Sequence, residues 1–438
     1  MRKISKISLV AAVAVAGFST ANAQPLEEAI KNVDVSGSVV YRYNNYDDNG
    51  TNPKGPQTEN NNYKIGLNLS SKVNDYVKFN SRFIVGDSKT ASFAKLDSKK
   101  DQTGDAQADV TLSNAYFGFT AIPNTIVNIG KQGLTTPYTV AVDINGNEQN
   151  GTGILALSTF GPITAGAGYF NATNIGDSNE TSAAVTGGNL PGTTTKRNAI
   201  NTVAKNGYDM YVATVQGDLD FVKLEAWYAG MQNTFGSYTL AATSKLDLAE
   251  NANLGLEARY VNLQLNSKAI QATNAGALGA LTSDDNSMFR LAVDGKFSIV
   301  NARLAYTMTD KDGGLTALDN DAKNTSLGWF ITSNGIADAD YFQGALGVDI
   351  LDNLNFTAHY GYLKADKNDA GKVTINNHSL LGNMNNQDLK QQEVYGQLTY
   401  KMSKNLSTYL RYGQFEQKEA GNKTIDQNAG RLQVAYTF

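Results

Sequence analysis

The sequence predicts a transmembrane antiparallel β-barrel of about eighteen strands, and three observations support this fold class. The last segment, from Gly430 to Phe438, alternates apolar and polar residues and ends on an aromatic residue. Segments with the same period of two recur along the whole chain. Short turns and long polar loops alternate between them, as in outer-membrane barrels with periplasmic turns and extracellular loops. Lipid on one face and water on the other explain the alternation.

A secretory signal peptide is expected at residues 1–23. Basic residues precede the apolar stretch 7–18, and Ala21-Asn22-Ala23 supplies the small residues of a cleavage site. We therefore expect cleavage between Ala23 and Gln24 and a single barrel domain over residues 24–438. The apolar stretch is too short to span a bilayer as a helix, and no later segment has the required length and apolarity.

Composition excludes several classes of protein. Cysteine is absent, so disulfides and thiolate metal sites make no contribution. The formal net charge of −4 argues against nucleic acid as a partner. A mean hydropathy of −0.34 is compatible with a barrel, because only alternate strand residues need to be apolar.

The first strand is predicted from about Val33 to Asn44, with valines and tyrosines on one face and Asp34, Ser36, Ser38 and Arg42 on the other. The second, Tyr63 to Ser70, and the third, Tyr76 to Gly86, repeat this pattern. Fifteen further strands are predicted near residues 109–120, 126–132, 151–158, 163–171, 207–217, 220–230, 236–247, 253–264, 287–297, 299–309, 340–350, 354–364, 390–401, 405–416 and 428–438. A count of sixteen remains open if 109–120 and 340–350 belong to loops.

Turn residues such as Asn, Asp, Gly and Pro separate strands within the predicted hairpins, for example at 71–75, 121–124 and 217–220. Longer polar loops are predicted at 45–62, 87–108, 133–150, 172–206, 265–286, 310–339, 365–389 and 417–427. The short connection at 231–235 departs from the alternation.

Several motifs resemble the Campylobacter-type major outer-membrane porin family. They are the stretch Pro25 to Gly37 with the following Tyr41-Arg42-Tyr43, then Gly130-Lys131-Gln132, Gly151-Thr152-Gly153 and the aromatic terminus. The resemblance implies an eighteen-stranded barrel, a homotrimer, and diffusion of small hydrophilic solutes and ions with a preference for cations. It also implies a calcium ion near the pore. The aromatic C-terminal strand resembles the signal that outer-membrane barrel proteins show to the barrel assembly machinery, which is therefore an expected partner.

An eighteen-stranded lumen is too wide for side chains to fill, so a selective channel needs a loop that folds inward. The loop 133–150 is the best candidate, with Asp143 and Glu148 as carboxylates at the constriction. Basic residues are expected to face them from the strands: Arg42, Lys64, Lys78, Arg82 and Lys131. Strand parity also points Glu257, Arg259, Arg290, Arg303 and Arg411 into the lumen, where Glu257 and Arg259 are expected to pair with each other. Solvated loop acids and rim cations are the alternative interpretation.

Calcium prefers several oxygen ligands, which Asp143, Glu148 and Asp177 would supply. Nothing resembles an EF-hand loop, and a chain without bound metal is equally compatible with the sequence.

Two other functions are weighed against a general porin. An enzyme is disfavoured, because only His359 and His378 are available and no triad pattern surrounds them. A monomeric eighteen-strand channel specific for one solute class stays open because of the inward arginines, and so does an adhesin role for the long loops.

Overall fold

The computed structural model describes residues 33–49, 58–87, 91–96, 108–175, 208–266, 284–366 and 388–438. The predicted signal peptide, the cleavage site and Asp177 lie outside these ranges. No helix among the described residues has the length and apolarity needed to cross a bilayer.

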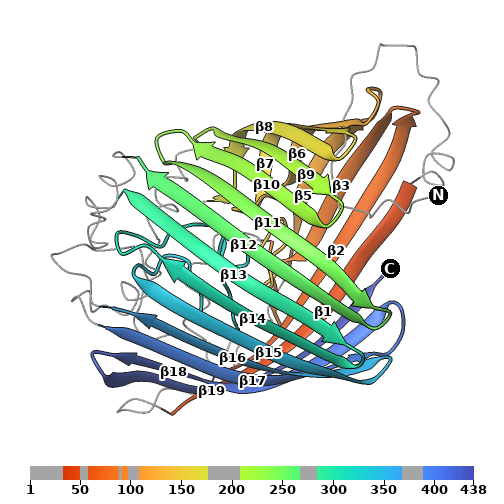
Figure 1. Cartoon of the computed structure of the whole chain (residues 1–438). Helices are drawn as coiled ribbons and strands as arrows, with labels where there is room; N and C mark the ends of the chain where they lie inside the picture. Colours follow the sequence, from red (N-terminus) through yellow and green to blue (C-terminus); the bar gives the residue numbers. More distant parts are fainter. Residues whose placement is uncertain are drawn as a thin grey trace.

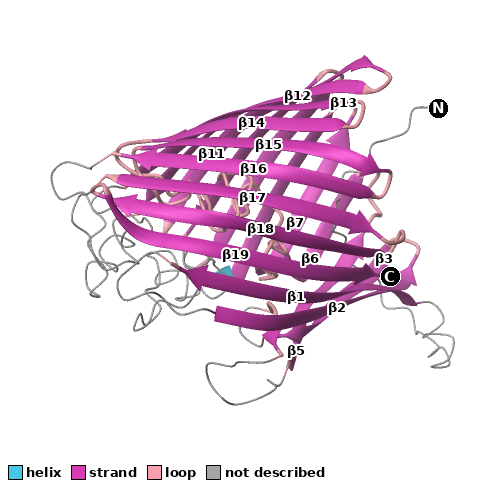
Figure 2. Ribbon diagram, turned by 90° about the horizontal axis from the view of Figure 1, so that it is seen from below, coloured by secondary structure: helices cyan, strands magenta, loops and turns pink. Residues whose placement is uncertain are grey.

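The described chain forms one antiparallel sheet that closes on itself as an eighteen-stranded barrel (Figures 1 and 2). The first strand pairs with the last in register from Ser38 opposite Thr437 to Asp48 opposite Gln427. A further strand of two residues pairs only with β2, at Asn62 and Tyr63. The strands are β1 (Val33–Asp48), β2 (Thr58–Asn74), β3 (Val77–Gly86), the short β4 (Ala94–Lys95), β5 (Asp109–Phe119), β6 (Thr125–Gly133), β7 (Asn150–Phe160), β8 (Ile163–Thr173), β9 (Met210–Leu219), β10 (Val222–Met231), β11 (Phe235–Ala249), β12 (Ala252–Leu265), β13 (Asp285–Phe297), β14 (Val300–Thr309), β15 (Ala339–Leu351), β16 (Leu354–Ala365), β17 (Leu389–Lys401), β18 (Leu406–Glu419) and β19 (Asn422–Thr437).

The eighteen predicted strands are therefore confirmed, including 109–120 and 340–350, which become β5 and β15. The predicted loop 417–427 is wrong. Strands β18 and β19 continue through it to a tight turn at Ala420-Gly421, and both turn residues have positive φ. The ion pair of Glu416 with Lys423 crosses from β18 to β19, and Lys418 pairs with the same carboxylate along β18, so these charged residues suit a hairpin.

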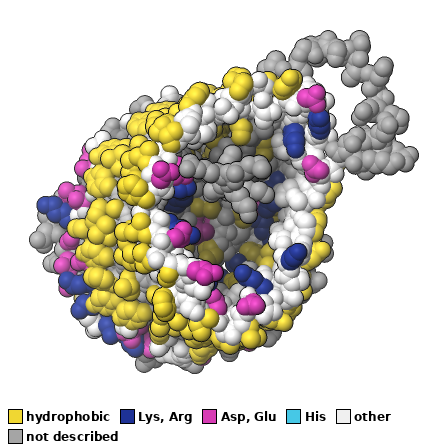
Figure 3. Space-filling model, turned by 45° about the vertical axis from the view of Figure 1, so that its right-hand side comes forward, with side chains coloured by type: hydrophobic (Ala, Val, Ile, Leu, Met, Phe, Trp, Pro, Cys, Tyr) yellow, Lys and Arg dark blue, Asp and Glu magenta, His cyan; other side chains and the backbone are white. Residues whose placement is uncertain are grey.

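The outer and inner faces follow the predicted alternation. On β19, Leu432 and Tyr436 are exposed on the outside, whereas Arg431 is only 6% exposed. On β13 and β14, Leu291 and Leu304 point outward and Arg290 points inward. Figure 3 shows the resulting apolar outer surface and charged side chains around one mouth of the barrel. This is the arrangement that hydrocarbon outside and water inside require.

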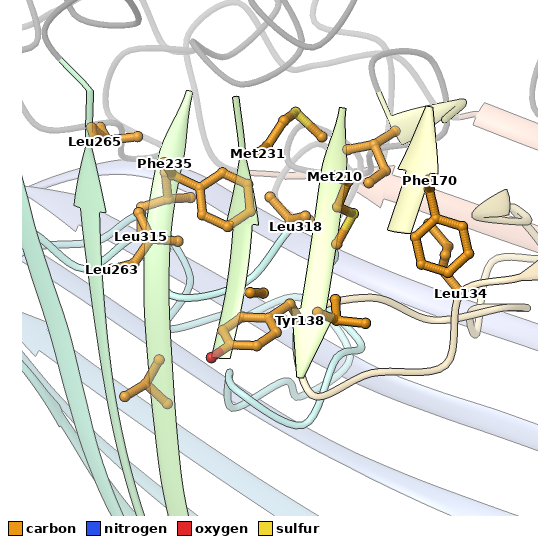
Figure 4. Close-up of a cluster of buried hydrophobic side chains, with 14 of the residues drawn as sticks. Leu134, Tyr138, Phe170, Met210, Met231, Phe235, Leu263, Leu265, Leu315 and Leu318 are labelled. Carbon is orange, nitrogen blue, oxygen red and sulfur yellow. The ribbon is translucent and has the colours of Figure 1, made fainter. Parts of the chain in front are cut away.

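One part of the inner wall is apolar instead of polar. Inward residues near one end of β8–β13, including Phe170, Met210, Met231 and Leu263, form a buried cluster with loop residues (Figure 4). A second buried cluster joins Trp329, Phe330 and Ile331 to the inner wall of β15–β19. Both clusters are apolar because segments of two loops pack inside the barrel on these strands.

Candidate pore constriction

The loop between β6 and β7 folds back on itself inside the barrel. Its base is closed by a hydrogen bond of 2.8 Å from the amide of Leu134 to the carbonyl oxygen of Gln149. At its tip the carboxylate of Asp143 accepts hydrogen bonds from the amides of Asn145 and Asn147, at 2.9 and 2.8 Å. Gly146, with φ of +86°, allows the chain to turn there. The tip is therefore a fixed turn that Asp143 organises from within.

Glu148 anchors this loop to the barrel wall. Its carboxylate is 1% exposed and accepts hydrogen bonds from Lys64 of β2 at 2.7 Å and from Arg82 of β3 at 2.8 Å. The hydroxyl of Ser113, in the bulge of β5, donates a third. Burial alone would raise the pKa of Glu148, but the hydrogen bonds and charges of Arg82 and Lys64 outweigh it and hold the pKa below its usual value. Glu148 is thus a buried, compensated anion.

The remaining basic contacts of the loop go to its backbone. Arg42 donates from Nη2 to the carbonyl oxygen of Ile144 at 2.8 Å, and Lys64 donates to that of Gly146 at 2.6 Å. The guanidinium of Arg42 also lies 4.2 Å from the ring centre of Phe93. Arg42, Lys64 and Arg82 therefore come together with the predicted loop, but they touch it directly instead of facing it over open water.

Two of the predicted basic residues lie apart from this group. Lys78 is exposed near the start of β3, away from the ion pairs of Glu148. Lys131 shares the outer face of β6 with Ile129, because the buried Asn128 and Gln132 take the inner face. Its amine donates to the carbonyl oxygen of Leu112 at 2.7 Å. For Lys131 the structure departs from the prediction, since strand alternation turns the side chain outward.

A second inward loop, residues 310–338 between β14 and β15, lies against the first. The amides of Leu318 and Asn324 donate to the carbonyl oxygens of Tyr138 and Pro137 in the first loop, at 2.8 and 2.9 Å. Gln149 of the first loop donates in return to the carbonyl oxygen of Leu318 at 3.0 Å. The two loops are therefore hydrogen-bonded to each other inside the barrel.

Charged residues of the wall hold the second loop as well. Arg290 donates to the carbonyl oxygens of Thr325 and Lys323, at 2.5 and 2.9 Å. Glu257 fixes this arginine and Arg259 through ion pairs of 2.6 and 2.9 Å. The expected pairing of Glu257 with Arg259 is present, and Arg290 joins it.

A buried carboxylate anchors the other half of the second loop. Glu393 of β17 accepts hydrogen bonds from the amides of Trp329, Phe330 and Ile331, at 3.1, 2.8 and 3.3 Å. Sequence reasoning placed 310–339 among the polar loops and missed this role. The apolar run Trp329-Phe330-Ile331 within a polar segment was the signal that could have revealed it, because such a run needs a surface to pack on.

The last two predicted lumen arginines differ in their partners. Arg303 of β14 pairs with Asp294 of β13 at 2.6 Å and is partly exposed. Arg411 of β18 lies over the rings of Trp329 and Tyr395, at 5.1 and 5.0 Å. Both point inward, as strand parity requires.

Acidic residues gather where the two loops meet. The carboxylate of Asp321 accepts a hydrogen bond from the amide of Ile144 at 2.9 Å. Burial raises the pKa of Asp143, and burial together with the nearby charge of Asp143 raises the pKa of Asp319 to about 8. The same two causes raise the pKa of Asp321 to about 6. These carboxyls repel one another, and Asp321 and Asp319 gain charge as the pH rises through about 6 and 8.

The residues proposed for calcium are not assembled as predicted. Glu148 is fully engaged by cations, and Asp177 lies outside the described residues. In the part of the chain that the structure describes, no group of three or more His, Cys, Asp or Glu side chains could hold a metal ion. Asp143 and Asp319 fit a hard cation better, because Oδ2 of the buried Asp319 has no hydrogen-bond partner. The loop between β6 and β7 carries Asp143 and the loop between β14 and β15 carries Asp319, so the two carboxylates meet from distant parts of the barrel.

Comparison with known proteins places the chain in a family. No curated protein matches it. Among solved structures it is similar to Pseudomonas aeruginosa OprD, with 17% identity and a TM-score of 0.64 over 92% of this chain and 95% of OprD. It is also similar to P. aeruginosa OccK8 (OprE), with 16% identity and a TM-score of 0.65 over 93% and 98% of the two chains. P. aeruginosa OccK2 (OpdF), solved in complex with glucuronate, matches with 14% identity and a TM-score of 0.61 over 92% and 98%. At these identities the likeness shows the fold alone.

The family model for the Campylobacter major outer membrane protein matches residues 1–438, and the chain therefore belongs to that family, as the sequence motifs predicted.

Proposed function

We propose that this outer-membrane protein is a general diffusion channel that passes small hydrophilic solutes and ions and prefers cations. The observation that carries the proposal is the closed barrel with two inward loops joined by hydrogen bonds inside it. A closed barrel provides a polar path through lipid, and loops that narrow the path allow selection by size and charge. The relatedness in fold to OprD and the Occ proteins supports the same reading.

The proposed cation preference rests on the acids at the loop junction. Asp143, Asp319 and Asp321 meet there, while the carboxylate of Glu148 is compensated by Lys64 and Arg82. An excess of negative charge at the narrowest point concentrates cations and repels anions. The preference should therefore depend on these three carboxylates far more than on Glu148.

Planar-bilayer recording of the purified protein tests the proposal. We expect stable conductance steps in groups of three, as for a homotrimer, with a reversal potential that favours cations in a salt gradient. A protein that inserts without conducting would overturn the channel. Single steps that one solute class blocks would favour the second candidate, a monomeric channel specific for that class. The solved glucuronate complex of OccK2 and the inward arginines of this chain favour that candidate over an adhesin.

We further propose that the chain is not an enzyme. His359 of β16 stacks on Tyr395 at 4.4 Å between ring centres, an aromatic contact that does not activate a nucleophile. His378 lies outside the described residues. Sustained ester or peptide hydrolysis by purified protein, lost on His359→Ala, would contradict this.

For calcium, we propose that Asp143 and Asp319 supply carboxylate ligands at the loop junction. The support is the unpartnered Oδ2 of Asp319 and the mutual repulsion of the two carboxyls, which a divalent cation would relieve. Titration calorimetry with CaCl₂ should show binding that Asp319→Asn weakens and Asp75→Asn, in an exposed turn, leaves unchanged. Equal binding by both variants would remove calcium from the junction.

A further inference from the structure

The inner wall of β18 and β19 carries two arginines directly opposite each other. Arg411 and Arg431 are partners in the strand register. Like charges in this arrangement destabilise a sheet unless something offsets them. Within the described residues neither arginine takes part in an ion pair, whereas lumen arginines of β3, β12, β13 and β14 each do. In the described part of the chain, this wall therefore carries two guanidinium charges without an ion-pair partner.

The guanidinium of Arg411 is held in a fixed orientation. Its Nε and Nη2 donate to Oε1 of Gln397, at 2.9 and 2.6 Å. Three aromatic rings, those of Trp329, Tyr395 and Tyr409, surround it with ring centres 5.0–5.4 Å away. Nη1 donates to no group in the part of the chain that the structure describes. One edge of this rigid, partly buried guanidinium thus has no partner among the described residues and faces the lumen.

The acceptors around this arginine are neutral amides. Gln397 serves Arg411, and Oε1 of Gln433 accepts from Arg42 at 2.8 Å and from the hydroxyl of Tyr409 at 3.1 Å. The nearby carboxylate of Glu393 is committed to three backbone amides of the second loop. An arginine with amide partners keeps its full charge available for an anion.

Arg431 differs from Arg411 in its exposure. It is 6% exposed and donates to Asn44 at 2.6 Å and to Tyr46 at 3.3 Å. Arg431 therefore adds positive potential from behind the surface, and Arg411 is the group that can touch a solute.

We propose that Arg411 forms a binding subsite for small solutes that carry a carboxylate on a planar ring. The free edge of the guanidinium donates to the carboxylate, a charge-assisted geometry that arginine suits well. The stacked rings of Tyr395 and His359, 4.4 Å apart, add a flat surface beside it. The inference rests on the proposed channel function and adds a local anion site to a pore whose loop junction favours cations.

Benzoate is the probe, and benzyl alcohol is its neutral counterpart with the same ring. Both are added to a single channel in a planar bilayer, and the concentration that halves the open-channel current is measured. We expect benzoate to block the wild-type channel and benzyl alcohol to have no comparable effect. Arg411→Gln should raise the half-blocking concentration by about tenfold or more, as loss of one charge-assisted contact implies. Arg303→Gln, which removes a lumen arginine already paired with Asp294, should leave it within about twofold.

A second variant keeps the arginine and tests the same idea. Gln397→Glu places a carboxylate on the acceptor of Arg411 and should abolish the block by satisfying the guanidinium internally. Equal block by benzoate and benzyl alcohol, or unchanged block in either Arg411→Gln or Gln397→Glu, would overturn the subsite. A protein without conductance would instead overturn the channel function, so the two failures are distinguishable.

Discussion

Replacing Glu148 by Gln removes the charge that anchors the first inward loop. In the wild type this carboxylate is 1% exposed and joins Lys64, Arg82 and Ser113. Glutamine keeps one acceptor oxygen and presents its amide group to two cations. Removing one partner of a buried ion pair costs about 3–5 kcal/mol. With about 1.4 kcal/mol for each factor of ten, the detached loop should gain roughly two to four orders of magnitude in population.

Single-channel recording measures this effect directly. Glu148→Gln should raise the open-channel noise and the mean conductance, because the loop leaves the wall more often. The barrel itself should melt as in the wild type, since no strand ladder depends on Glu148. Asp75→Asn is the matched control, because it removes one carboxylate that lies in an exposed turn and pairs with the exposed Lys72. Wild-type noise and conductance in Glu148→Gln would refute the anchoring role.

The pH dependence of the anchor follows from the sign of its pKa shift. Because Arg82 and Lys64 hold the pKa of Glu148 below its usual value against the effect of burial, the folded loop binds fewer protons than the detached loop. The anchoring free energy is therefore complete above the ordinary glutamate pKa of about 4.3 and is lost as pH falls below it. Conductance noise should stay low from neutral pH down to about 5 and rise only in stronger acid.

Three other perturbations test the second loop, the loop junction and the loop tip. The cation preference should increase from pH 5 to 9 as Asp321 and Asp319, with pKa values of about 6 and 8, ionise. In the double variant Asp319→Asn, Asp321→Asn, the reversal potential should not change with pH over this range. Glu393→Gln leaves one acceptor oxygen for three backbone amides, so about 1–3 kcal/mol of anchoring should be lost and conductance should rise; unchanged conductance would argue that apolar packing alone holds this loop. Gly146→Ala forces a side chain onto a residue with positive φ, 2.8 Å from the ring of Phe93, and should loosen the loop tip by about 1–3 kcal/mol, visible as added current noise.

The barrel was predictable because a single rule, the alternation of outward apolar and inward polar residues, describes its strands. The face of a residue such as Arg431, between Gly430 and Leu432, follows from its place in the alternation. The strands keep this alternation apart from local bulges, such as the one at Ser113 of β5. The hairpin of β18 and β19 was misjudged because Lys418, Glu419 and Lys423 look like loop residues in isolation. Lys423 has its partner Glu416 on the neighbouring strand, which a local pattern does not reveal, and Lys418 pairs with the same carboxylate.

The inward loop 133–150 was predicted, but its contacts were not. A constriction with acids on a loop and bases on the wall suggests two rows that face each other over water. The structure instead brings Glu148 into contact with Lys64 and Arg82 and buries all three. Pairing is favoured because a buried loop carboxylate needs partners to offset the loss of hydration. Lys131 was misjudged for a simpler reason, since adjacency to the loop in sequence does not fix the face of its strand.

The two loops are anchored to different groups of neighbouring strands in the barrel wall. Glu148 and Arg42 tie the first loop to β1, β2, β3 and β5, whereas Arg290 and Glu393 tie the second to β13 and β17. The loops then contact each other through backbone hydrogen bonds and a shared apolar cluster. Wall charges that sequence reasoning assigned to solutes are thus largely consumed as loop anchors. Among the described residues, those that we propose to act on a passing solute are the acids at the loop junction and Arg411, and they carry opposite charges.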